Sequence, residues 1–99
     1  MSYWKNRYKY HQLMDEFINA RISGVEFEKE FFRMMRKDRD SKSYPQQEQP
    51  ELESVLSRVF TACDVFNPDA DFRSEYEYDE TELRDFVRNI LAENLSLFM

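Results

Sequence analysis

The sequence predicts an all-α, single-domain antiparallel four-helix bundle over residues 1–99, with a short extra turn between the third and fourth helices. Apolar residues recur in four stretches at the spacing of one-sided helices. One glycine and three prolines are too few for the frequent tight turns of an all-β domain. A chain of 99 residues fits one hydrophobic core, and four amphipathic helices with short joins bury their stripes most simply as a bundle.

The first two helices follow from apolar periodicity and from one capping pattern. A helix is expected from about Tyr3 to Ile22, with the stripe Tyr10, Leu13, Met14, Phe17 and Ile18. Ser23 and Glu26 have the spacing of a capping box, with Ile22 and Phe27 as a hydrophobic staple, so a second helix begins at Ser23. Its stripe is Phe27, Phe31, Met34 and Met35, used to fill the core. Phe32 lies off this stripe and either covers a neighbouring helix or is exposed as a contact.

The third helix has the most regular stripe in the chain. The polar stretch SKSYPQQEQP, Ser41 to Pro50, is expected to be a surface connection. Pro50 suits a helical first turn, and Glu51 and Glu53 suit its dipole. The stripe is Leu52, Val55, Leu56, Val59, Phe60 and Cys63.

A short turn and a fourth helix complete the expected fold. Asn67 and Pro68 cap and open the turn, and Val65, Phe66 and Phe72 are expected to pack it against the core. Asp79 and Glu82 repeat the capping-box spacing, with Tyr78 and Leu83 as the staple pair. The helix that follows has the stripe Leu83, Phe86, Val87, Ile90, Leu91 and Leu95.

Few residues could support catalysis. His11 is the only histidine and Cys63 the only cysteine, and they lie in different expected helices. We expect His11 to be a surface or packing residue and Cys63 a small buried apolar residue, so we name no catalytic group and expect no enzyme. A single cysteine and the lack of a signal-peptide or membrane-span pattern indicate a soluble, cytoplasmic protein.

The acidic character belongs to the second half of the chain. The net charge is −6, but residues 1–44 carry ten Lys or Arg and seven Asp or Glu, whereas residues 45–99 carry four and thirteen. Asp64 to Leu83 alone holds eight carboxylates and one arginine. Phosphate contacts need Lys and Arg, so direct nucleic-acid binding by this half is disfavoured and a basic protein partner is favoured. The plainer alternative is a solvated loop that keeps the protein soluble.

The candidate binding surface is this acidic region. Tyrosines alternate with carboxylates there, a composition typical of interfaces that combine anchoring with electrostatic steering. Glu82 and Asp85 project outward from the fourth helix, and Asp64 is an acid at a helix C-terminus, against the dipole preference. The candidate residues are Asp64, Asp69, Asp71, Glu75, Tyr76, Glu77, Tyr78, Glu80, Glu82 and Asp85.

Calcium binding is an alternative for the same region. Asp69, Asp71, Glu77 and Glu80 fall at positions 1, 3, 9 and 12 of an EF-hand-like register. Arg73 occupies position 5, and Ser74 stands where such a loop needs glycine. We therefore expect neither a metal nor a cofactor.

Three stretches resemble the colicin D type of immunity proteins, the bacterial self-protective colicin-like family that also includes some contact-dependent-inhibition immunity proteins. They are FINARISGVEFEKEFF (Phe17 to Phe32), LSRVFTACDVFNPD (Leu56 to Asp69) and YDETELRDFV (Tyr78 to Val87). The resemblance implies a helical bundle that binds the C-terminal toxic domain of its cognate toxin and blocks an RNA-cleaving, specifically tRNA-cleaving, site. We expect a one-to-one complex with that toxin domain. It also implies that acidic side chains replace substrate phosphates, at positions such as Asp64, Asp69, Glu80 and Glu82. An acidic adaptor or nucleic-acid mimic for another basic protein is the alternative.

Overall fold

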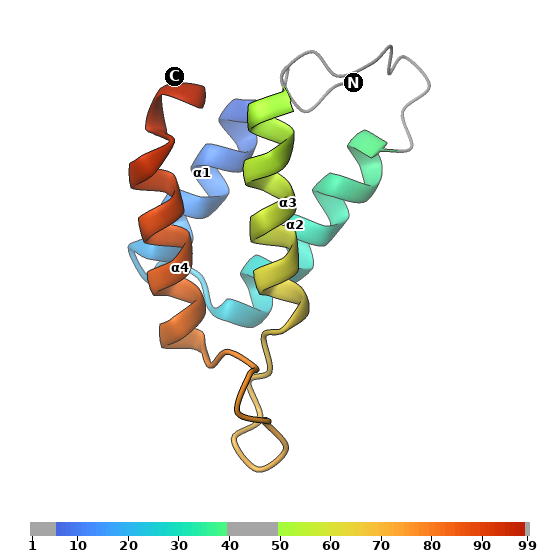
Figure 1. Ribbon diagram of the computed structural model, residues 1–99, viewed down its shortest axis with the longest axis vertical. Helices are drawn as coiled ribbons and strands as arrows, with labels where there is room; N and C mark the ends of the chain where they lie inside the picture. Colours follow the sequence, from blue (N-terminus) through green and yellow to red (C-terminus); the bar gives the residue numbers. More distant parts are fainter. Residues whose placement is uncertain (1–5, 40–49, 99) are drawn as a thin grey trace.

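Four helices make up the protein. The computed structural model describes residues 6–39 and 50–98, with α1 (Arg7–Ile18), α2 (Gly24–Arg39), α3 (Pro50–Asp64), α4 (Glu80–Glu93) and a short 3₁₀ helix η1 (Leu95–Leu97). Consecutive α-helices run in opposite directions, and α2 leans away from α3 toward its C-terminal end (Figure 1). The all-α, four-helix architecture is confirmed, as is the start of α3 at Pro50. Apart from Pro50, the expected surface connection lies outside the described residues.

The apolar stripes close over one core. Phe17 stacks on Phe27 with ring centroids 4.4 Å apart, and Tyr10 meets Phe31 edge to face at 5.7 Å, so aromatic contacts hold α1 against α2. Met14 is fully buried, which confirms its core-filling role, and Met34 and Met35 pack against the same core. The largest fully buried side chains are Tyr10, Met14, Phe17, Phe27, Phe31, Leu52, Leu56, Val59, Leu83, Val87, Ile90 and Phe98.

The end of α1 differs from the expectation. The helix was expected to reach Ile22, but it stops at Ile18 and the chain turns through Ala20, which has a positive φ of 59°. Ala20 N–H donates to Phe17 O (3.0 Å) and Arg21 N–H donates to Glu16 O (2.8 Å), the two bonds of a Schellman motif. Glycine usually occupies the left-handed position, so an alanine there hides this stop in the sequence.

The start of α2 confirms the expected capping box and explains the only glycine. Glu26 N–H donates to Ser23 Oγ (3.1 Å), and Ser23 N–H donates to Glu26 Oε1 (3.3 Å). Gly24 follows, and a Cβ atom there would lie 2.7 Å from Phe66 Cζ and 3.1 Å from Glu80 Oε1. Glycine therefore lets the start of α2 approach both Phe66, just beyond the end of α3, and the start of α4.

The C-terminal segment also departs from the sequence expectation. Leu95, expected in the α4 stripe, is 41% exposed, because the chain leaves the α-helix at Asn94 and continues as η1. The η1 turn instead directs Phe98 into the core, where it is fully buried and its ring centroid lies 5.9 Å from that of His11. Half-buried His11 is thus a packing residue, as expected.

A buried carboxylate links α1 to α2. Asp38 is only 3% exposed and accepts hydrogen bonds from Asn6 Nδ2 and Tyr10 Oη, both at 2.7 Å. Burial of a carboxylate is costly unless its oxygens are hydrogen-bonded, and each oxygen of Asp38 has a donor here. The hydroxyl of Tyr10 therefore satisfies a buried acid while its ring packs in the core.

Candidate functional site

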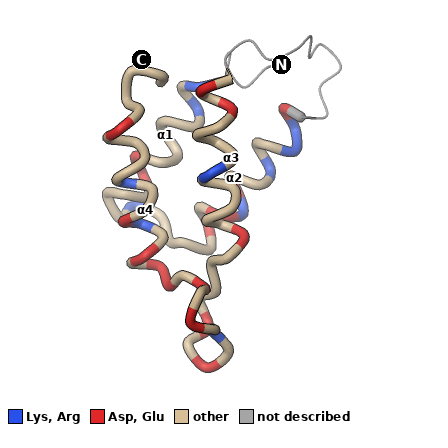
Figure 2. The backbone as a smooth tube through the Cα atoms, viewed as in Figure 1, with Lys and Arg blue, Asp and Glu red and all other residues tan. Residues whose placement is uncertain are grey.

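Residues 65–79 form one closed loop, called the acidic loop here, which projects beyond the end of the bundle (Figures 1 and 2). Phe66 and Tyr78 pair in an isolated β-bridge: Tyr78 N–H donates to Val65 O (2.8 Å) and Asn67 N–H donates to Tyr78 O (2.9 Å). The loop thus leaves and rejoins the bundle at one point, as compact Ω-loops do. Phe66 anchors that point in the core at 7% exposure.

Polar side chains inside the acidic loop hold its shape. Asn67 Nδ2 donates to Phe72 O (3.3 Å) and to Glu77 Oε1 (3.2 Å), and its Oδ1 accepts from Asp69 N–H (3.0 Å). Arg73 Nε donates to Asn67 O at 2.8 Å. Glu77 Oε1 also accepts from Ser74 N–H at 2.9 Å. The bond from Ser74 is the main cause that lowers the pKa of Glu77, and the bond from Asn67 adds to it. The carboxylate of Glu77 therefore braces the loop while remaining charged.

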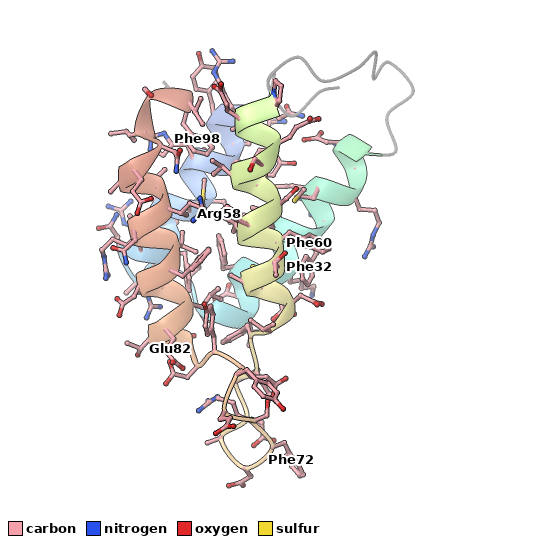
Figure 3. The ribbon with its side chains drawn as sticks, in the orientation of Figure 1. Phe32, Arg58, Phe60, Phe72, Glu82 and Phe98 are labelled. Carbon is pink, nitrogen blue, oxygen red and sulfur yellow. The ribbon has the colours of Figure 1, made fainter. Side chains whose placement is uncertain are left out.

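The tip of the loop, residues 69–76, presents carboxylates and aromatic rings to solvent. Asp69, Asp71 and Glu75 are exposed, and the one bond among them runs from Asp71 N–H to Asp69 Oδ1 (3.0 Å). Phe72 is 79% exposed and Tyr76 is 78% exposed. The expectation that Phe72 packs on the core is wrong: the turn that joins Phe72 N–H to Asp69 O lies at the far end of the loop, as Figure 3 shows for Phe72. Phe66, which was also expected to pack on the core, is buried there.

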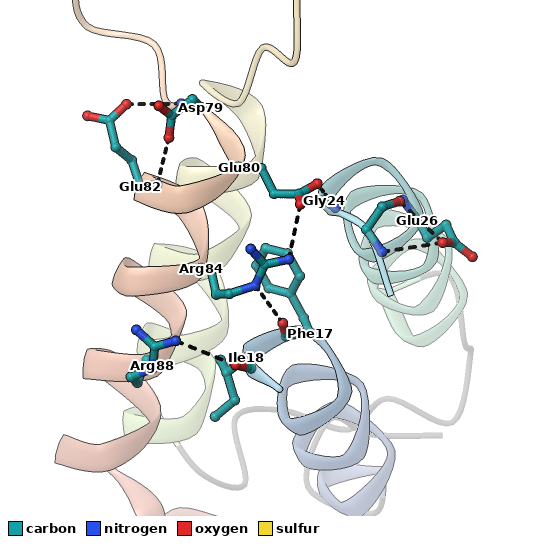
Figure 4. Close-up of polar contacts among 10 residues, drawn as sticks. Phe17, Ile18, Gly24, Glu26, Asp79, Glu80, Glu82, Arg84 and Arg88 are labelled. Carbon is teal, nitrogen blue, oxygen red and sulfur yellow. Dashed lines mark hydrogen bonds and ion pairs between the residues drawn. The ribbon is translucent and has the colours of Figure 1, made fainter. Parts of the chain in front are cut away.

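Glu80 has a different environment, at the junction of three helices (Figure 4). Its Oε1 accepts from Gly24 N–H at 2.6 Å, and its Oε2 pairs with Arg84 at 3.1 Å. Arg84 Nε in turn donates to Phe17 O at 2.9 Å, and its guanidinium lies 4.7 Å from the centre of the Phe17 ring. The Gly24 bond is the main cause that lowers the pKa of Glu80, and Arg84 adds to it. Glu80 therefore joins α4 to the start of α2 and, through Arg84, to the end of α1.

Glu82 and Asp85, the two other candidate acids on α4, are exposed but have local partners. Glu82 N–H donates to Asp79 Oδ1 (2.8 Å) and Asp79 N–H donates to Glu82 Oε1 (3.0 Å), which confirms the expected capping box. Asp85 pairs with Arg88 at 2.6 Å. Arg88 offsets part of the Asp85 charge, whereas the second oxygen of Glu82 still contributes to the acidic surface.

Asp64, at the C-terminal end of α3, lies near α2. It is exposed, and its charge adds to the effect of burial in raising the pKa of Glu28, so the two carboxylates are neighbours. Phe32 lies against Phe60 on the same pair of helices, with ring centroids 4.9 Å apart (Figure 3). Phe32 thus covers the neighbouring helix, one of its two expected roles. Phe60, expected in the core stripe, is instead 38% exposed.

A groove between α3 and α4 opens beside the acidic loop. Its volume is about 590 Å³. The groove forms where short side chains on the outer face of α3 lie opposite larger aromatic side chains. Its lining residues are Ser54, Ser57, Arg58, Thr61, Ala62, Val65, Tyr76, Tyr78 and Phe86. We call it the α3–α4 groove. The groove was not predicted from the sequence, although Ser54, Ser57 and Thr61 at helical spacing on one outward face were a signal for it.

The calcium register is not assembled as a ligand set. Glu77 is bonded within the loop and Glu80 points toward Gly24, while Asp69 and Asp71 lie at the tip. Over residues 6–39 and 50–98, no group of three or more His, Cys, Asp or Glu side chains is placed to hold a metal ion.

The expected burial of Cys63 is confirmed. The side chain is 1% exposed, and burial raises the pKa of its thiol, with a smaller contribution from Glu28. A buried, protonated thiol is a poor nucleophile. Among the described helices, none has both the length and the apolar character that crossing a bilayer requires.

The helical scaffold thus presents a braced acidic loop and an adjacent groove at one end of the bundle. The family model for bacterial self-protective colicin-like immunity matches residues 7–94, which is most of the chain. The chain therefore belongs to the colicin-like immunity family, as its sequence motifs indicated. Immunity proteins inhibit a cognate toxin and are not enzymes. A search of the curated proteins finds no match to this chain.

Proposed function

We propose that this protein neutralises the C-terminal nuclease domain, a tRNase, of a cognate bacteriocin or contact-dependent-inhibition toxin by covering its RNA-binding active site. The complex forms in the cytoplasm between one copy of each protein. One observation carries the proposal: the acidic loop holds exposed carboxylates beside exposed rings at the end of the bundle. Basic side chains that bind phosphates in a nuclease would pair with these carboxylates as they do with RNA.

The candidate residues divide into contact and bracing groups in this proposal. Asp69, Asp71, Glu75 and Tyr76 contact the toxin directly, because they are exposed at the tip of the acidic loop. Glu77, Tyr78 and Glu80 hold the loop and the start of α4 in position through bonds inside the protein. Asp64, Glu82 and Asp85 lie around the base of the loop and extend the negative potential. Bonds that hold the loop before binding reduce the entropy lost on association.

Protection of cells and of RNA tests the proposal. The toxin domain encoded beside this gene is expressed with and without the protein, and total tRNA is examined on a denaturing gel. Co-expression should restore growth and keep tRNA intact, and adding purified protein to the purified domain should stop cleavage in vitro. Growth arrest that continues despite a stable complex, or protection from a toxin that cleaves no RNA, would contradict the proposed mechanism. Binding to an unrelated basic protein with equal affinity would favour the acidic-adaptor alternative.

A further inference from the structure

The α3–α4 groove adds apolar surface next to the carboxylates. Ala62, Val65 and Phe86 contribute its apolar lining, and Tyr76 and Tyr78 belong both to the groove and to the acidic loop. Exposed carboxylates chiefly steer a basic partner and set the rate of association. Most of the affinity in protein interfaces comes from a few side chains that fill well-packed sites, so an inhibitor that relied on charge alone would bind weakly.

The charges around the groove differ along its length. At the loop end, Glu75 and Glu77 flank Tyr76, so this end is negative. Further along α3, the groove is lined by exposed Arg58, which lies on the side of α3 that faces α4 (Figure 3). Arg58 forms no ion pair within residues 6–39 and 50–98. A segment that fits both ends therefore carries a cation near the loop and an anion near Arg58.

We propose that the α3–α4 groove receives an apolar side chain of the toxin, from a segment with Lys or Arg on the side of the acidic loop and Asp or Glu on the side of Arg58. This inference rests on the proposed function, because it names the part of the same toxin that supplies the anchor. The groove and the acidic loop then form one continuous surface, in which the loop recognises the cations and the groove holds the chain that bears them.

The net charge of the protein disfavours a second copy as the occupant. Each chain carries a net charge of −6, so two copies that met through this face would repel one another. Like charges placed opposite one another oppose association. The free protein should therefore be monomeric at this surface.

One pair of matched variants tests the groove. Ser57→Trp fills it from α3, whereas Ser96→Trp places the same bulk at an exposed position in η1, outside the groove. Affinity is measured by titration calorimetry with the purified nuclease domain encoded beside this gene, after circular dichroism has shown that both variants fold. Loss of one buried apolar anchor predicts a dissociation constant about tenfold to hundredfold higher for Ser57→Trp and a change under about threefold for Ser96→Trp.

A third variant tests the orientation of the partner segment. Arg58→Glu reverses the charge at the far part of the groove and should weaken the complex about tenfold or more, whereas Arg58→Lys should have little effect. Equal affinities for wild type and Ser57→Trp would overturn the groove inference and leave the proposed function standing. No binding by the wild type would overturn both. Tighter binding by Arg58→Glu would contradict the assigned orientation, and wild-type dimers that Ser57→Trp dissociates would identify a second copy as the occupant.

Discussion

Replacing Glu80 with alanine should destabilise the fold, although this residue is one of the candidate acids of the binding surface. The substitution leaves the buried Gly24 N–H without its 2.6 Å acceptor, a loss of about 1–3 kcal/mol. It also removes the ion pair with Arg84, which contributes less than about 1 kcal/mol because 43% of the Glu80 side chain is exposed to solvent screening. We expect the free energy of unfolding to fall by about 2–3 kcal/mol in total.

Urea denaturation followed by circular dichroism measures this loss. Glu75→Ala is the matched control: it removes an exposed glutamate of the acidic loop and should change the free energy of unfolding by less than about 0.5 kcal/mol.

The lowered pKa of Glu80 also predicts how this stability difference depends on pH. A carboxylate with a depressed folded-state pKa stabilises the protein above the unfolded-state pKa, near 4.3, and this contribution disappears as pH falls through the folded-state value. The difference in free energy of unfolding between wild type and Glu80→Ala should therefore shrink below about pH 4. A difference that stays constant from pH 6 to pH 3, or equal stability of the two proteins at pH 7, would refute the assigned role.

Three further predictions concern local strain, the exposed ring and steering. Ala20→Gly should stabilise the protein by about 1 kcal/mol, because glycine adopts the positive φ of 59° without strain. In the same urea denaturation, Ala92→Gly within α4 should destabilise the protein by a similar amount. Destabilisation by both variants would exclude strain at Ala20. Phe72→Ala should leave the melting temperature unchanged but weaken toxin binding about tenfold or more. Val25→Ala, at another exposed apolar position, is the control and should not weaken binding. Unchanged binding of Phe72→Ala in calorimetry would exclude Phe72 from the interface. Stopped-flow association with the toxin should slow steeply as salt rises, and a salt-independent rate would exclude electrostatic steering.

Features set by neighbouring residues were predictable from the sequence. Both capping boxes form as expected because each needs only residues three apart, Ser23 with Glu26 and Asp79 with Glu82. Most of each helical stripe was equally recoverable, since periodicity depends on local geometry, but Phe60 and Leu95 were expected in the stripes and are exposed. The expected end of α1 was wrong because the stop depends on an alanine in a conformation that usually indicates glycine.

Features set by distant residues were not predictable in this way. In the sequence, Glu80 and Glu75 both look like acids of one acidic stretch. The hydrogen-bond partner of Glu80, Gly24, lies 56 residues away along the chain, and no local sequence pattern reveals that contact. Phe72 looked like a core residue because aromatic rings usually bury, yet the bridge between Phe66 and Tyr78 excludes it from the bundle. The α3–α4 groove likewise depends on how Tyr76 packs across from α3.

Two double charge reversals test the central claim, that the toxin contacts the acidic loop, most directly. Asp71→Lys with Glu75→Lys changes the tip of the loop, and Glu51→Lys with Glu93→Lys changes two exposed acids at the opposite end of the bundle. Each pair raises the net charge from −6 by four units, so any difference reflects position and not overall charge. We predict that the loop pair weakens binding of the toxin domain about a hundredfold or more and that the distal pair changes it less than about fivefold. Equal loss from both pairs, or loss from the distal pair alone, would contradict the account.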